Sequence, residues 1–262
     1  MEAMFYTGAF LFGLAVGSFL NVVVWRWPRQ ESIITPGSHC PKCLKPIAWY
    51  DNIPIFSWLI LRARCRHCKE KISIRYPLIE LISGIISVIA FFCFGFSKWY
   101  FIYYAFLSAL LAASIIDIEH RLIPDEISIG GAVIGIGLSF LPERKIPAFD
   151  SLLGAVIGFL ILFLVAEAYY ILTRREGMGF GDAKLLAMIG AFLGFRSLPL
   201  IIFIGSFVGT IVGIFFIAVS QEGRFYKIPF GPFLSLAGLI YLILFSRQIN
   251  LPLGPFNQLF GI

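Results

Sequence analysis

Long apolar runs separated by short polar segments dominate the chain. The runs lie at approximately 3–24, 77–96, 99–118, 127–141, 151–172, 183–197, 199–219 and 232–246. A transmembrane helix needs about 20 mostly apolar residues, and most of the runs approach that length, although the fourth, sixth and eighth are short. The pattern predicts an all-α polytopic membrane protein with about eight transmembrane helices.

Composition supports this prediction. Of the 262 residues 59% are hydrophobic and only 14% are charged, and the mean hydropathy of +0.88 lies outside the range of soluble globular domains. The first run has a long apolar part, no basic start and no small-residue cleavage pattern before Trp25. We therefore expect it to be a transmembrane helix rather than a secretory signal.

The sizeable polar segment lies between the first two runs, at about residues 25–76. It contains ten Lys/Arg against three acidic residues, and the positive-inside rule places such a segment in the cytoplasm. Eight helices threaded from there put sixteen Lys/Arg on the cytoplasmic side and five on the other. We expect a first transmembrane helix at 1–24, a cytoplasmic loop domain at 25–76 and a transmembrane core at 77–262. The pI of about 9.1 then reflects topology and attraction to an anionic lipid bilayer, not nucleic-acid binding.

Four of the five cysteines form two C-x-x-C pairs in the loop domain, Cys40/Cys43 and Cys65/Cys68. Their spacing is close to that of a four-thiolate zinc site, in which each pair presents two sulfur ligands from one side. Two disulfides are the alternative, but a cytoplasmic segment lies in a reducing compartment. Four thiolates leave no open coordination position, so we expect the zinc to be structural. Cys93 stands alone in the second run, where we expect it to pack.

Acidic residues inside or beside transmembrane helices are costly and usually functional. The chain has five of note: Glu80, Asp117, Asp125, Glu167 and Asp182. Asp125 and Asp182 both suit the N-cap of a helix, and Glu80 and Glu167 suit ion pairs with basic groups inside the bundle. Asp117 is harder to explain in this way, because it ends a predicted helix and a C-terminal turn disfavours an anion.

The predicted topology places Asp117 and Asp182 on the same, cytoplasmic side of the membrane at similar shallow depth. Two neighbouring carboxylates are what an aspartyl protease needs: one, ionised, takes a proton from water, while the other, protonated, donates to the scissile carbonyl. Gly177, Gly179 and Gly181 would let irregular backbone approach closely and let an extended peptide reach the acids.

Six stretches resemble, in order, the motifs of the type IV prepilin peptidases, bacterial members of the GxGD aspartyl protease group. They are the N-terminal signature at 17–22, the two C-x-x-C pairs, the entry to the second helix at 75–81, the catalytic motifs at 117–125 and 177–184, and the C-terminal motif at 228–233. A single GxGD stretch is a weak signal. Six motifs in this order, spread over nearly the whole chain, are a strong one.

The resemblance implies a bifunctional enzyme of the bacterial cytoplasmic (inner) membrane with its active site facing the cytoplasm. Such enzymes remove the basic leader of type IV prepilins and related pseudopilins after a glycine, then methylate the new N-terminal amine with S-adenosylmethionine. The family associates the cytoplasmic loop with methylation, yet this loop has no glycine-rich nucleotide-binding motif. The resemblance makes Asp117 and Asp182 the catalytic pair, with possible supporting roles for Glu80, Asp125, Gly179, Gly181 and Lys184.

Other functions stay open at this point. A monofunctional protease of the preflagellin peptidase type is expected to lack the zinc loop, and a presenilin-like protease usually has tyrosine where this chain has Ile116. A transporter that binds cations at Asp117 and Asp182 predicts polar groups near the bilayer midplane and internal symmetry, and the sequence shows neither. A zinc-loop scaffold without catalysis would make the paired acids coincidental.

Overall fold

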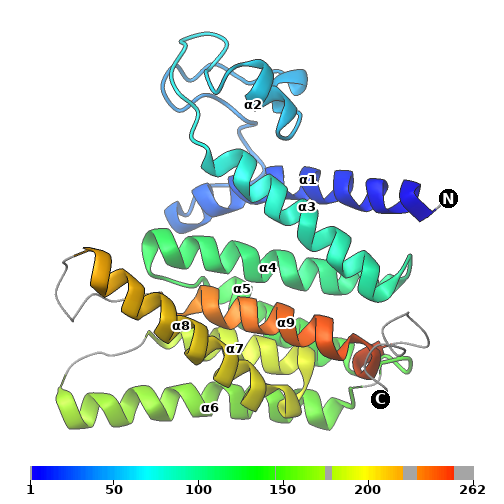
Figure 1. Ribbon diagram of the computed structural model, residues 1–262, viewed down its shortest axis with the longest axis vertical. Helices are drawn as coiled ribbons and strands as arrows, with labels where there is room; N and C mark the ends of the chain where they lie inside the picture. Colours follow the sequence, from blue (N-terminus) through cyan, green and yellow to red (C-terminus); the bar gives the residue numbers. More distant parts are fainter. Residues whose placement is uncertain (1, 145, 175–178, 221–228, 251–262) are drawn as a thin grey trace. The chain divides into compact units, whose positions relative to one another are not determined.

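The computed structural model describes residues 2–144, 146–174, 179–220 and 229–250. Within these ranges the chain is helical and contains no β-strand (Figure 1). The α-helices are α1 (Glu2–Arg26), α2 (Phe56–Ile60), α3 (Arg75–Phe94), α4 (Lys98–His120), α5 (Asp125–Leu138), α6 (Ala148–Thr173), α7 (Phe180–Leu193), α8 (Leu198–Ser220) and α9 (Gly231–Asn250). The prediction of an all-α protein is confirmed for this part of the chain.

Five segments of the described ranges are long and apolar enough to cross a membrane. They are Glu2–Arg29, Arg75–Phe94, Lys98–His120, Ala148–Thr173 and Phe195–Phe216. The other three predicted spans correspond to α5, α7 and α9. With 14 residues each, α5 and α7 rise about 21 Å at 1.5 Å per residue, less than the hydrocarbon core of about 30 Å. The polytopic membrane class is confirmed, whereas eight crossings stay a prediction.

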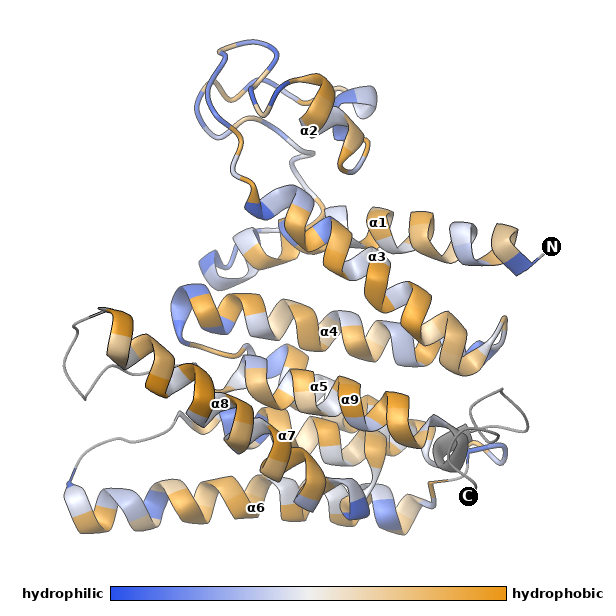
Figure 2. Ribbon diagram, in the orientation of Figure 1, coloured by the Kyte–Doolittle hydropathy of each residue, from blue (hydrophilic) through white to orange (hydrophobic). Residues whose placement is uncertain are grey.

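Hydropathy follows the same division (Figure 2). The long helices are mostly apolar, and the segment between α1 and α3 is mostly hydrophilic apart from α2. Only 22% of the most apolar window of α6, and the same share in α8, is buried inside the protein. The exposed apolar side chains of these two helices match the lipid-facing surface of a membrane protein.

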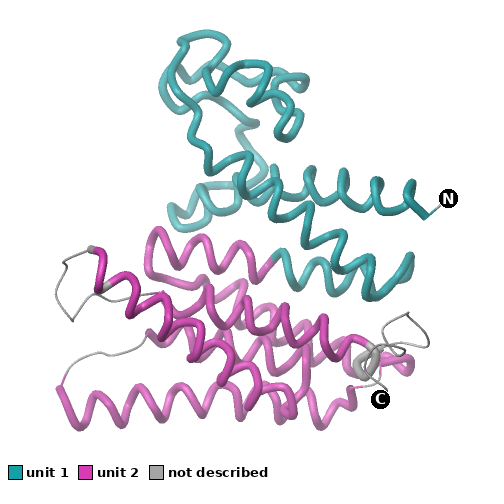
Figure 3. The backbone as a smooth tube through the Cα atoms, in the orientation of Figure 1, with its two compact units in different colours: residues 1–108 teal, residues 109–262 magenta. Residues whose placement is uncertain are grey.

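The chain forms two compact units, residues 1–108 and 109–262, so that α4 begins in the first unit and ends in the second (Figure 3). In the first unit, α1 and α3 pack against each other. The Ser83 hydroxyl donates to the Gly13 carbonyl at 2.8 Å, and the Ser87 hydroxyl donates to the Ala9 carbonyl at 2.7 Å. A buried hydroxyl without a partner is unfavourable, so these bonds fix the register between the two helices.

In the second unit α7 is the central helix and contacts α5, α6 and α9. Ten of its 14 residues are buried. At its C-terminal end the Arg144 guanidinium donates to the carbonyls of Ala191 and Phe192, at 3.1 and 2.7 Å, and the Ser151 hydroxyl donates to Ala191 at 2.6 Å. The last carbonyls of a helix have no partner within it. Arg144 and Ser151 provide that partner and hold α7 at the end opposite Asp182.

Candidate active site and metal centre

Asp117 lies in the last turn of α4 and is 6% exposed. Its Oδ2 atom accepts a 3.0 Å hydrogen bond from the backbone N–H of Gly231, the first residue of α9, which lies 114 positions away in the chain. Backbone donors at the start of a helix favour a carboxylate. The start of α9 therefore compensates for the unfavourable position of an acid at the end of α4.

Asp182 lies in the first turn of α7 and is 7% exposed. The N-cap residue of α7 is Gly179, and no side chain caps this helix, so the N-cap interpretation of Asp182 is wrong. The Asp182 carboxylate interacts with the charge of Asp117 and with the backbone N–H groups of Gly179 and Gly231. Among the described residues, its Oδ1 atom has no hydrogen-bond partner. The fold brings the two acids together within one unit.

The glycines before Asp182 differ in their surroundings, and Gly177 lies outside the described residues. A Cβ added to Gly181 would lie 3.1 Å from the Cβ of Ile123, whereas a Cβ added to Gly179 would meet nothing closer than 3.9 Å. Gly179 has an extended backbone with φ of −78°, which any residue adopts. The close approach of Ile123 therefore explains why position 181 is glycine, whereas nothing in the described residues requires glycine at position 179.

Lys184 and Asp125 form an ion pair of 2.6 Å between α7 and α5, with side chains that are 28% and 57% exposed. Asp125 is the first residue of α5, and Pro124 occupies the N-cap position without a side-chain capping bond. The N-cap interpretation of Asp125 is therefore wrong. The ion pair holds the start of α5, including the neighbouring Ile123, next to the start of α7.

Within the described ranges, two glutamates do not form the internal ion pairs that the sequence suggests. Glu80 is 7% exposed, but its Oε2 atom accepts a 2.7 Å hydrogen bond from the backbone N–H of Ile55, and the Ser18 hydroxyl also bonds its carboxylate. Glu167 is exposed on α6 rather than enclosed in the bundle. Neutral donors can take the place of a cation as hydrogen-bond partners of a buried carboxylate, and residue spacing does not distinguish the two.

The four cysteines of the loop form one cluster, with all four sulfur atoms within 4.8 Å of one another. The Sγ atoms of Cys40 and Cys68 are 3.7 Å apart, close to the edge of about 3.8 Å in a tetrahedron with Zn–S bonds of about 2.3 Å. None of these cysteines forms a disulfide. Hydrogen bonds from the backbone of Cys68 and His67 lower the pKa of the Cys65 thiol to about 7, whereas desolvation and the neighbouring thiols raise the pKa of Cys68 to about 11. The first shift favours the thiolate that binds zinc, and the second reflects the mutual repulsion that a bound cation would relieve. The residues fit a zinc ion.

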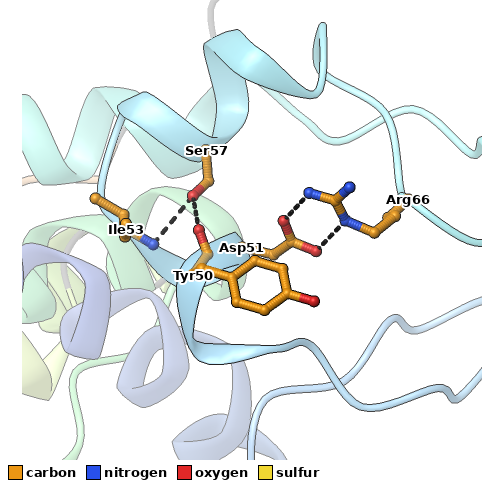
Figure 4. Close-up of polar contacts among 5 residues, drawn as sticks. All are labelled: Tyr50, Asp51, Ile53, Ser57 and Arg66. Carbon is orange, nitrogen blue, oxygen red and sulfur yellow. Dashed lines mark hydrogen bonds and ion pairs between the residues drawn. The ribbon is translucent and has the colours of Figure 1, made fainter.

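Polar contacts support the loop around this cluster (Figure 4). Arg66, within the second C-x-x-C pair, donates from Nε and Nη2 to the two carboxylate oxygens of Asp51 at 2.6 and 2.5 Å. The hydrogen bond from this guanidinium holds the pKa of Asp51 below its usual value. The Ser57 hydroxyl accepts from the Ile53 N–H at 3.1 Å and donates to the Tyr50 carbonyl at 2.8 Å. These bonds replace the apolar core that so short a segment cannot form.

A cavity of about 450 Å³ lies in the first unit and is lined by residues of α1, of α3 and of the loop between them. Its wall includes three aromatic, four acidic and five basic residues: Trp25, Trp58, Tyr76, Glu31, Asp51, Glu70, Glu80, Arg26, Lys45, Arg66, Lys71 and Arg75. Asn21 also lines it and is 3% exposed, and its Oδ1 atom has no hydrogen-bond partner among the described residues. The volume suits a small organic molecule.

Sequence reasoning missed the cavity and the role of Gly231. Gly231 and Pro232 begin an apolar run, which is a signal for the start of a helix. Nothing near them in the sequence indicates a contact with Asp117. The resemblance drew attention to the stretch 228–233 but gave none of its residues a function, and Ile228 lies outside the described residues.

Comparisons with known proteins give consistent matches. A model of the Bacterial Peptidase A24 N-terminal domain matches residues 11–94, and a model of the Type IV leader peptidase family matches residues 104–214. A prepilin leader peptidase/N-methyltransferase of Aeromonas salmonicida is 36% identical, covering 92% of this chain and 91% of the relative. Proteins of the same description from Pseudomonas putida and Legionella pneumophila are 36% and 34% identical, covering 92% and 93% of this chain and 91% and 93% of the relatives. No solved structure matches the chain.

Proposed function

Because the chain belongs to the type IV leader peptidase family, we propose that it is a membrane endopeptidase and N-methyltransferase of type IV prepilins or pseudopilins. It removes the leader peptide after a glycine and then methylates the new N-terminal amine. Relatives whose names contain both activities align with 92% of the chain. The regions that the two family models match include the cysteine cluster and the paired aspartates.

The observation that carries the proteolytic half is the proximity of Asp117 and Asp182 at the ends of α4 and α7. Two like charges so close to each other disfavour double ionisation, so the pair holds one proton. The ionised carboxylate removes a proton from the attacking water, and the protonated one donates to the carbonyl oxygen of the scissile bond. The tetrahedral intermediate then collapses, the C–N bond breaks, and the leaving amine takes a proton from the pair.

The orientation follows from charge. The segment 25–76 carries ten Lys/Arg, which favours a cytoplasmic location, and the paired aspartates are expected on that side of the bacterial inner membrane. A prepilin has an apolar helix in the membrane and a basic leader in the cytoplasm. The junction between them then lies at the shallow depth of Asp117 and Asp182, and no buried helix must unwind before cleavage.

The cysteine cluster is proposed to hold a structural zinc ion, because four thiolates complete the coordination and leave no position for water or substrate. The ion would be bound by Cys40, Cys43, Cys65 and Cys68 and would connect the two ends of a loop that has little apolar core. Zinc takes no part in either reaction in this scheme. Its role is to hold the shape of the loop.

The cavity in the first unit is the proposed site of methyl transfer. S-adenosylmethionine, when bound, supplies a methyl group on a positively charged sulfur. Aromatic faces and carboxylates are the groups that suit such a cation, and Trp58, Tyr76 and Glu31 line the cavity. The five Lys/Arg of the same wall suit the carboxylate that S-adenosylmethionine also carries. Glu80 is also in its wall and buried, and its proposed role is to accept the proton that the amine loses when the new N–C bond forms.

The experiment uses purified protein in lipid, a synthetic prepilin with Gly before Phe at the junction, and S-adenosylmethionine, with product mass as the readout. We expect loss of the leader plus one methyl group. Asp117→Asn and Asp182→Asn should each abolish cleavage. Asp150→Asn is the matched control, because Asp150 lies beside Gly194 at the other end of α7. This variant should cleave the prepilin at the wild-type rate. Cleavage by either active-site variant removes the assignment, and no mass change with any prepilin favours the transporter or scaffold function.

Methyl transfer is tested separately with a pilin peptide that already begins with phenylalanine. Glu80→Gln should lower its methylation at least tenfold and leave prepilin cleavage intact, since removal of one general base typically costs about 100-fold or more. Glu167→Gln removes an exposed carboxylate from α6 and serves as the control. Equal methylation by the wild type, Glu80→Gln and Glu167→Gln would exclude Glu80 from the methyl-transfer reaction.

A further inference from the structure

The start of α9 faces the two carboxylates of the candidate active site. The Gly231 N–H donates to Asp117 Oδ2 at 3.0 Å, and the same N–H group interacts with the Asp182 carboxylate. Gly231 itself is buried. A single backbone donor therefore lies next to both acids, and it comes from a helix that contains neither of them.

The local sequence explains why this donor is free. The first N–H groups of a helix have no carbonyl partner within it. In α9 the next residue is Pro232, which has no N–H, and the N–H groups of Phe233 and Leu234 already donate to the Phe230 carbonyl at 3.1 and 3.2 Å. The Gly231 N–H is thus the one donor of this first turn that the turn itself does not use, and it points at Asp117.

The contact also requires glycine at this position. A Cβ added to Gly231 would lie 2.7 Å from Asp117 Oδ2 and 3.2 Å from Cδ1 of Ile123. Real Cβ atoms are not found at the first of these distances. Any other residue would push the Asp117 carboxylate away from the donor, or push the start of α9 away from α4.

We propose that Gly231 is a positioning residue of the proteolytic site, whose N–H fixes the rotamer of Asp117 and offsets the negative charge that the two aspartates share. The proposal rests on the proposed function of Asp117 and Asp182. The donor binds Oδ2 of Asp117. This leaves Oδ1 of that residue, and Oδ1 of Asp182, which has no partner among the residues that the structure describes, for water and for the scissile carbonyl. A fixed dipole next to developing charge needs no reorganisation during the reaction.

A purely structural role predicts something different. If Gly231 only allowed α9 to pack against α4, its replacement would lower stability and weaken every activity of the protein together. A positioning role predicts a selective loss of the cleavage step. The two are separated by kcat against KM for cleavage, and by methylation of a peptide that needs no cleavage.

The first experiment compares Gly231→Ala with Gly238→Ala in full-length protein reconstituted in lipid. Both changes add one methyl group to α9, but at position 238 the nearest atom would be at 3.6 Å, an ordinary contact. For Gly231→Ala we expect kcat for prepilin cleavage to fall about 100-fold, as when one backbone or amide donor of an oxyanion site is removed, with unchanged KM and unchanged methylation of a precleaved peptide. Gly238→Ala should match the wild type in kcat for cleavage, in KM and in methylation of the precleaved peptide.

A backbone ester removes the donor without adding a Cβ, so it separates hydrogen bonding from steric effects. Glycolic acid can be incorporated at position 231 by cell-free synthesis into liposomes, with the same replacement at 238 as control. We expect the 231 ester to lose at least tenfold in kcat and the 238 ester to cleave normally. If the 231 ester cleaves at the wild-type kcat while Asp117→Asn is inactive, the proposal is wrong although the catalytic pair stands. If Asp117→Asn still cleaves, the assignment of the pair itself has failed.

Discussion

Replacement of Gly190 by alanine tests how the fold positions Asp182. Gly190 faces Gly154 where α7 crosses α6, and the two backbones touch. A Cβ added at position 190 would lie 2.5 Å from the Gly154 carbonyl carbon and closer still to its oxygen. Backbone cannot rotate away as a side chain can, so one of the two helices must move.

The size of the movement follows from the geometry. Ordinary contact begins at 3.4 Å, so α6 and α7 must separate by about 1 Å. Overpacking of this kind typically costs about 1–3 kcal/mol, and we expect the upper end because the clash is with backbone. The rate of prepilin cleavage should respond to this displacement more strongly than the free energy of unfolding does. Asp182 lies on the displaced helix, and a misplacement of about 1 Å at a reacting group reduces the rate about 100-fold.

The assay measures cleavage of a synthetic prepilin and thermal unfolding in the same detergent. Gly130→Ala is the matched control, since a Cβ there would meet nothing within 4 Å and alanine in place of glycine stabilises a helix by up to about 1 kcal/mol. We expect Gly190→Ala to unfold at a lower temperature and to cleave about 100-fold more slowly. A wild-type rate and melting temperature for Gly190→Ala would refute the reasoning that the close packing of α6 against α7 sets the position of Asp182.

Three further predictions concern other parts of the molecule. Replacement of Cys40 and Cys43 by serine should remove one zinc ion per chain, measured by mass spectrometry of the metal, whereas Cys93→Ala should retain it; equal metal content in all three proteins would exclude the site. Arg144→Met removes the guanidinium donor to the carbonyls of Ala191 and Phe192, of which Ala191 keeps the Ser151 hydroxyl, and should lower unfolding stability by about 1–3 kcal/mol; an unchanged melting curve would contradict this. Lys184→Met breaks a partly exposed ion pair and should cost only about 0.5 kcal/mol with less than a threefold change in cleavage rate, so an inactive but folded variant would show a larger role for Lys184.

The positions of the helices and the cysteine cluster could be predicted from the sequence because both depend on local pattern. The apolar runs contain most of every long helix, and the C-x-x-C spacing leads to sulfur atoms within 4.8 Å. The capping interpretations were wrong for Asp125 and Asp182 because the partners of these acids lie far away in the sequence. Each acid is near the start of its helix, as expected, but Asp125 pairs with Lys184, 59 positions away, and Asp182 meets Asp117.

Long-range contacts of this kind cannot be read from a single sequence. The N–H of Gly231 and the carboxylate of Asp117 meet only when α9 packs beside α4, and the hydrogen bond between Glu80 and Ile55 forms only when the loop folds back on α3. The location of Asp117 and Glu80 in the sequence indicated that both carboxylates are important. The sequence did not indicate which groups donate to them, because every backbone N–H has the same chemistry and only the fold determines which one is near.

The helices α5, α7 and α9 of the second unit have a common arrangement at the candidate active site. Each of α5, α7 and α9 starts close to Asp117 or Asp182: Ile123, before α5, packs near the added Cβ positions of both Gly181 and Gly231. The start of a helix carries partial positive charge and N–H groups without partners, and inside a bilayer such groups must be satisfied by protein. The Asp117 carboxylate accepts from the Gly231 N–H, and the Asp182 carboxylate interacts with the N–H groups of Gly179 and Gly231. The helix starts in turn reduce the cost of burying two acids. The helix starts and the acids therefore lie where each reduces the cost of burying the other.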